Sequence, residues 1–286
     1  MRYMVFAKRG FQYIKEHPVL LLPEVLLFIL TYFLTLGLYR FSGLSEFVKI
    51  AFASGERIDP SIFLRAFAHD YTTQIIISLA VFIFVTFILG VGMETIKFRM
   101  IKMVVQGEKV NMRDILEGRA FDFYRIIGMK VIIYLIASAI ALCLMLLASF
   151  VFSISDGLVA FAAWVSAGIG IALFVILSIG LLFRYPLLFL EGKNAATTVR
   201  ASFHYFTKHT KHVLISWLVY FGMAILFGIA SALASMVFAQ LQELVTGVTV
   251  IYLVSFTGAI AAFAVRLIYN VWAGLFLFES YNARKS

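Results

Sequence analysis

Six long apolar runs, separated by polar intervals, dominate the pattern of this chain. The runs cover residues 18–39, 71–93, 131–154, 157–183, 213–241 and 244–278. Each is long enough to cross a hydrocarbon core as a helix, which takes about 20 residues. A helix also pairs its own backbone groups where no water is available. The pattern therefore predicts an all-α, multi-pass membrane protein with six transmembrane helices, built as a single integral membrane domain over residues 1–286.

Basic residues gather in the intervals on one side of these runs. The N-terminal arm 1–17 holds 4 Lys or Arg, the interval 94–130 holds 8, the interval 184–212 holds 5 and the tail 279–286 holds 2. The opposite side holds only 4, all between residues 40 and 65. Because loops rich in Lys and Arg stay in the cytoplasm, we expect both termini and both basic intervals to be cytoplasmic.

The N-terminal arm predicts a short interfacial helix, because Met4, Val5, Phe11 and Ile14 recur at roughly helical spacing. A secretory signal also starts with basic residues. The apolar run after this arm, however, is too long for a signal peptide and contains Glu24. We therefore interpret that run as a retained first span.

Residues 41–70 form the only sizeable interval on the external side. Ser45 is placed to begin a short helix that Gly55 would end. Asp59 and Pro60 then suit the N-cap and the first position of a second helix. We expect this external insertion to form two short helices on the outer membrane surface.

A short motif precedes the first, third and fifth runs, with a basic residue, one or two small residues and then Phe-x-aromatic. The basic and first aromatic residues are Arg9 with Phe11, Arg119 with Phe121, and Arg200 with Phe203. Asn111 and Asn194, which suit helix caps, lead into the second and third copies. Because rings beside Lys or Arg suit the headgroup zone, we infer three hairpin-like pseudo-repeats, each preceded by an amphipathic cytoplasmic arm. The alternative is that interfacial arms share this composition without any repetition.

Composition agrees with a membrane protein. Of the 286 residues, 63% are hydrophobic and 14% charged, whereas soluble chains are near half apolar and a quarter charged. The net charge of +9 comes from the basic loops that fix the orientation of the chain in the membrane. Because the sequence contains no nucleic-acid-binding motif, we do not expect nucleic acid as a partner. Cys143, the single cysteine, excludes an internal disulfide and a cysteine zinc site, and we expect a small core side chain.

Candidate metal chemistry centres on three histidines in the second basic interval. His209 and His212 are three residues apart and could share a helix face, with His204 nearby. Lys208 and Lys211 would repel a cation there. We therefore favour an interfacial basic arm and expect no metal site.

Catalytic motifs are also weak. Residues 114–120 resemble the acidic metal-binding motif of lipid phosphotransferases, but the later Asp pair that completes a divalent-metal cage is missing. No nucleophile elbow and no phosphate-binding glycine loop occurs. We expect no catalytic residues, no cofactor and no enzymatic activity.

Two charges lie within the apolar runs, Glu24 in the first and Arg266 in the last. A charge at membrane depth usually faces protein or water and has a partner. Asn270 is one helical turn from Arg266 and would extend a polar strip toward Glu24. We interpret Glu24 and Arg266 as a structural pair and Asn270 as an extension of it. The alternative is a charged site on a water-filled pathway for an anion.

The stretch Glu191–Ser202, with Phe203 and Lys208 after it, resembles a signature of a broad group of six-helix integral membrane proteins from bacteria and archaea. In that group an acidic residue ends the fourth helix, and an Ala-x-x-x-Arg-x-Ser-like helix leads into the fifth. Its best-named branch is the membrane domain of glycerophosphodiester phosphodiesterases. The resemblance implies a six-helix architecture in a prokaryotic inner (cytoplasmic) cell membrane, and it supplies no catalytic residues. Because the sequence contains no phosphodiesterase domain, we expect no lipid hydrolysis.

Together these features predict a non-enzymatic membrane scaffold or accessory component. Its expected partners are anionic lipid headgroups at the cytoplasmic face, attracted by Lys and Arg beside the spans, or another protein. The alternative is a transporter or permease subunit with a pathway at the repeat interface. A membrane enzyme is the least favoured of the three.

Overall fold

The computed structural model describes residues 2–43, 60–152, 159–244 and 248–285, which form helices and short connections without a strand in these ranges. Six of the helices are long and apolar enough to cross a membrane. This confirms the prediction of an all-helical chain with six helices of the length and apolar character that a membrane span needs. The chain divides into two compact units. Unit 1 comprises Met1–Leu21 with Thr95–Ser286, and unit 2 comprises Leu22–Glu94.

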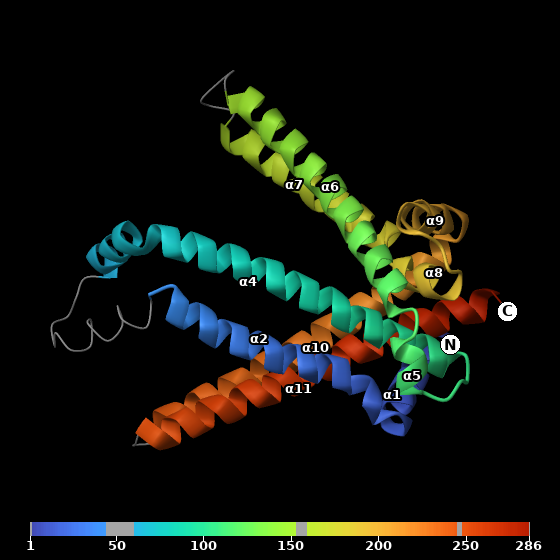
Figure 1. Cartoon of the computed structure of the whole chain (residues 1–286). Helices are drawn as coiled ribbons and strands as arrows, with labels where there is room; N and C mark the ends of the chain where they lie inside the picture. The colour runs from blue at the N-terminus through green and yellow to red at the C-terminus, as the bar shows by residue number, and fades with distance from the viewer. Residues whose placement is uncertain (1, 44–59, 153–158, 245–247, 286) are drawn as a thin grey trace. The chain divides into compact units, whose positions relative to one another are not determined.

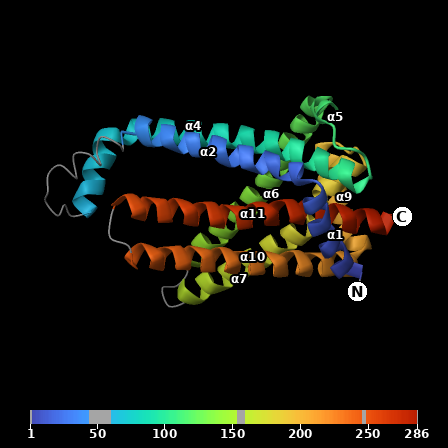
Figure 2. The same ribbon diagram turned by 90° about the horizontal axis from the view of Figure 1, so that it is seen from below.

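Unit 2 contains α2 (Leu22–Phe41) and most of α4 (Pro60–Val105). The two helices run side by side in both views (Figures 1 and 2). Pro60 begins α4, as its fixed backbone angle favours. However, α4 continues without a break to Val105. The prediction of a separate second helix on the outer surface is therefore wrong. No further proline in this stretch interrupts the backbone hydrogen bonds. The first expected surface helix lies outside the described residues.

Unit 1 holds the arms and two helical hairpins. Its elements are α1 (Arg2–Glu16), the 3₁₀ turn η1 (Pro18–Leu21), the end of α4, α5 (Met112–Leu116), α6 (Arg119–Phe152), α7 (Val159–Gly180), α8 (Arg184–Leu190), α9 (Ala195–Lys208), α10 (Thr210–Leu244) and α11 (Val248–Lys285). In Figure 1, α6 runs beside α7 and α10 beside α11. Both chain termini lie at the same end of this unit as α8 and α9 (Figure 1).

Several local signals act as predicted. The side-chain oxygen of Asn111 accepts a hydrogen bond from the backbone N–H of Arg113 at 3.1 Å. The Asn194 oxygen accepts from the backbone N–H of Thr197 at 3.0 Å and so caps α9. A helix break that was not among these predictions separates α7, which ends at Gly180, from α8, which begins at residue 184. These short-range signals explain where the arms begin.

The packed core of unit 1 lies at the end of the hairpins near the termini. Every residue of α11 from 271 to 281 is buried, and Trp272 and Phe276 are completely enclosed. Phe98, from the end of α4, stacks on Tyr185 of α8 with ring centroids 4.0 Å apart. Farther along the hairpins the apolar side chains are largely exposed. Cys143 is among the exposed residues, so its expected place in the core is wrong. Such apolar surfaces need a hydrocarbon environment to cover them.

The first arm packs closely against α11. The indole N–H of Trp272 donates to the carbonyl oxygen of Ala7 at 3.0 Å. A Cβ placed on Gly10 would lie 3.0 Å from the same ring, so the close approach depends on the missing side chain. Met4 and Val5, two of the residues whose spacing predicted an interfacial helix, are 69% and 48% exposed. Docking on Trp272, rather than apolar spacing alone, decides which face of α1 is buried.

Candidate functional site

A pocket of about 260 Å³ opens where α8, α9 and the end of α11 meet. We call it the basic pocket, and its lining residues are Leu187, Glu191, Lys193, Ala201, His204, Tyr205, Lys208, His209, Tyr281 and Arg284. All ten belong to unit 1. The lining holds three Lys or Arg side chains and two histidines but only one carboxylate. The basic pocket is therefore electropositive.

Helix α9 supplies much of this lining through its periodicity. Ala201, His204, Tyr205 and Lys208 follow one another at intervals of three, one and three residues, which places them on one helix face. The Asn194 cap determines where this helix starts and so which residues share that face. The same spacing is also typical of an interfacial arm, so the sequence alone does not show that this face lines a pocket.

The single carboxylate of the pocket already has two partners. The hydroxyl of Tyr281 donates to Glu191 Oε1 at 2.5 Å. Lys193 Nζ lies 2.7 Å from the other carboxylate oxygen. Within the described part of the chain, neither Lys208 nor Arg284 has a carboxylate at ion-pair distance. Two cations of the pocket are therefore available to an external anion.

Arg125 of α6 holds the backbone beside the pocket through hydrogen bonds to two carbonyl groups. Its guanidinium is buried and donates to the carbonyl oxygen of Leu188 at 2.6 Å and, through Nε, to that of Lys193 at 2.8 Å. A further N–H donates to Asp122 Oδ1 at 2.7 Å. Because the carbonyl groups belong to α8 and to the connection before α9, Arg125 holds the segment that carries Lys193. The sequence alone does not indicate this role, since Arg125 is one of 8 Lys or Arg residues in the interval 94–130.

Tyr205 and His209 report the electrostatic character of the pocket. The Tyr205 hydroxyl is buried and, in the part of the chain that is described, has no hydrogen-bond partner. Burial raises the pKa of Tyr205 to about 12, so the hydroxyl keeps its proton at neutral pH. Burial, followed by the positive charges of Arg284 and Lys208, lowers the pKa of His209. Both effects leave neutral side chains beside unpaired cations.

The three clustered histidines do not meet at one site. His204 and His209 line the basic pocket. His212 does not line it; this side chain is buried, and its Nδ1 lies 2.9 Å from the Tyr3 hydroxyl. No group of three His, Cys, Asp or Glu side chains is arranged for a metal ion among the described residues.

The predicted arm residues fall into two classes. Arg9 pairs with Glu279 at 2.6 Å, and Phe11 stacks on Trp272 at 5.8 Å between ring centroids. Arg9 and Phe11 make these contacts although both are exposed. In the other two arms, Arg119, Phe121 and Arg200 are also exposed, and Phe203 is partly buried. Arg119 also begins α6, which continues into the span, so the second arm is not a separate helix.

The intramembrane polar residues lie in different units. Arg266 is exposed on α11 of unit 1, and Asn270 one turn later is partly buried. Glu24 lies in the first turn of α2, in unit 2, and is partly buried. Their pairing stays a prediction.

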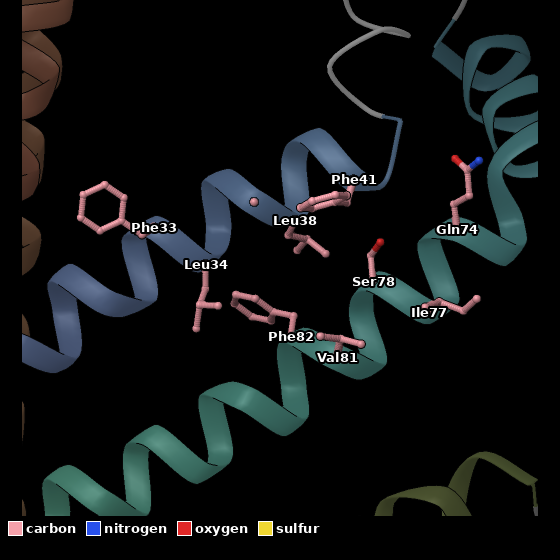
Figure 3. A pocket seen from close by; sticks show the side chains of 10 residues that line it. Phe33, Leu34, Leu38, Phe41, Gln74, Ile77, Ser78, Val81 and Phe82 are labelled. Carbon is pink, nitrogen blue, oxygen red and sulfur yellow. The ribbon is translucent and has the colours of Figure 1, made fainter.

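A second cavity of about 450 Å³ lies between α2 and α4 within unit 2. Figure 3 shows its lining, in which apolar side chains from both helices meet and only Gln74 and Ser78 carry polar groups. Both helices are long and apolar enough to span a membrane. The residues that line this apolar groove include no charged side chain.

No protein-family model matches the chain, and neither a curated protein nor a solved structure matches it.

Proposed function

We propose that this chain is a non-enzymatic component of a prokaryotic inner (cytoplasmic) cell membrane that holds anionic lipid headgroups in the basic pocket. The observation that carries the proposal is the charge of the pocket, where Lys208 and Arg284 have no carboxylate partner among the described residues while Glu191 is already engaged. Each Lys or Arg near an anionic membrane surface contributes about 1 kcal/mol of attraction. Two such cations at a fixed site favour an anionic headgroup over a zwitterionic one.

The charge distribution of the sequence supports a cytoplasmic location for the pocket. The residues that line it come from the second basic interval and the C-terminal tail, which the positive-inside rule places in the cytoplasm. Two of the three proposed arms, α1 and α9, are separate helices packed in unit 1. Their packing supports a role in forming the end of unit 1 that holds the basic pocket. This role is in keeping with the proposed repeat and with the resemblance to the membrane domain of glycerophosphodiester phosphodiesterases.

Thermal unfolding in detergent tests the proposal. Phosphatidylglycerol should raise the Tm of the wild-type protein, because a ligand that binds only the folded state stabilises it. Phosphatidylcholine should not. The double variant Lys208→Gln/Arg284→Gln should bind phosphatidylglycerol roughly 30-fold more weakly, at about 1 kcal/mol for each lost charge.

A matched control changes the same number of charges away from the pocket. Lys109 and Lys211 are exposed and do not line it. The variant Lys109→Gln/Lys211→Gln should keep the response of the wild type. Equal losses in both double variants would mean that net charge, not the basic pocket, attracts the lipid.

A further inference from the structure

We infer that the preferred ligand of the basic pocket is a phosphate monoester bound as a dianion, an inference that rests on the proposed function. The first argument is charge. The positive charge of Lys193 is matched by Glu191, and with the histidines counted as neutral, Lys208 and Arg284 leave two positive charges. A phosphate monoester carries about −1.5 to −2 at pH 7, whereas the phosphodiester of most anionic phospholipids carries a single negative charge.

The second argument is hydrogen bonding. Lys208 and Arg284, which have no carboxylate at ion-pair distance among the described residues, both present donors to the pocket. Phosphate oxygens only accept, and an arginine can donate two parallel hydrogen bonds to them. A cationic headgroup would instead meet three Lys or Arg side chains and a single carboxylate, Glu191, which already pairs with Lys193.

The third argument is size. The pocket volume of about 260 Å³ corresponds to roughly nine water molecules at about 30 Å³ each. That space is sufficient for a phosphate with a short polar fragment. The same chemistry occurs in a lipid that ends in a phosphate group, such as phosphatidate, and in soluble glycerol phosphate or inorganic phosphate.

The experiment compares these ligands on the full chain in phosphatidylcholine nanodiscs. Phosphatidate and phosphatidylglycerol are titrated as lipids, and glycerol phosphate and inorganic phosphate as soluble ligands, by native mass spectrometry and calorimetry. Phosphatidate should bind at least about fivefold more tightly than phosphatidylglycerol, because one further charge contact contributes about 1 kcal/mol to the binding free energy. Soluble phosphates that compete with phosphatidate would support the shared chemistry, and their binding in preference to phosphatidate would identify a soluble source.

Arg284→Lys provides the sharpest variant, because it keeps the positive charge and removes the planar fork that can donate two parallel hydrogen bonds to a phosphate. Affinity for the monoester should fall about tenfold, as for a lost hydrogen bond to a charged group. The Tm of the ligand-free protein should not fall, since Arg284 is exposed and has no carboxylate at ion-pair distance among the described residues. Unchanged affinity in Arg284→Lys would overturn the inferred contact.

The outcomes separate this inference from the proposed function. If both anionic lipids bind equally and more tightly than phosphatidylcholine, the monoester inference fails while the proposed function stands. If neither binds more tightly than phosphatidylcholine, both fail.

Discussion

Arg125 joins α6 to the backbone on either side of Glu191. Its donors are shared between Asp122 and the carbonyl oxygens of Leu188 and Lys193. Arg125→Lys keeps the charge but loses the planar fork that reaches all three acceptors. We predict a loss of stability of about 3 kcal/mol, at the lower end for a broken buried ion pair, together with weaker anion binding.

The control is Arg113→Lys, which makes the same exchange at an exposed residue of α5. Thermal unfolding and phosphatidylglycerol titration measure both effects. If Arg125→Lys behaved like this control, the backbone beside the pocket would not depend on the guanidinium.

Glu24 and Arg266 are the second pair that can be tested at the scale of single residues. If they form the predicted structural pair, unfolding of Glu24→Gln, Arg266→Gln and the double variant in detergent should give coupled losses. The coupling should amount to about 0.5–3 kcal/mol, as for residues in contact. Additive losses would show that the two residues do not interact, and would favour the alternative in which Arg266 faces water on a transport pathway.

At the scale of elements, α1 depends on a close approach that one glycine permits. A larger side chain at residue 10 would meet the indole ring of Trp272. Gly10→Leu should therefore destabilise the protein by about 1–3 kcal/mol through overpacking and increase hydrogen exchange in α1. Gln12→Leu, at an exposed position of the same helix, should leave both unchanged. Normal exchange in Gly10→Leu would mean that α1 does not need this contact.

The length of the apolar runs was sufficient to predict the six long helices, and Asn111 and Asn194 predicted two helix starts correctly. These features depend on neighbouring residues, so the sequence contains them directly. The buried face of α1 was not predictable in this way, because Ala7 and Gly10 face the core through contact with Trp272, more than 250 residues away. The partners of Arg125 were hidden for the same reason. Long-range contacts decide them, and the local pattern does not record these contacts.

The basic pocket could be predicted only in part. The spacing of Ala201, His204, Tyr205 and Lys208 identifies one face of α9. That Arg284 joins this face from the end of α11 follows only from the folded chain. The sequence therefore indicated a basic surface, whereas the structure defines a cavity and shows which cations are unpaired.

For the whole molecule, the core of unit 1 and the basic pocket occupy the same end, while the described parts of the hairpins beyond this core expose apolar side chains. This arrangement suits a protein whose spans are covered by hydrocarbon and whose packed end meets the headgroup zone. A ligand at that end would contact α8, α9 and α11 together. We therefore expect lipid binding to stabilise the unit as a whole.

The most direct test of the proposed function is native mass spectrometry of the protein extracted from its own membrane in mild detergent. The wild type should retain an anionic phospholipid, and Lys208→Gln/Arg284→Gln should lose it while Lys109→Gln/Lys211→Gln keeps it. Equal retention of anionic lipid by the wild type and the pocket variant would contradict the assignment of the basic pocket as the headgroup site.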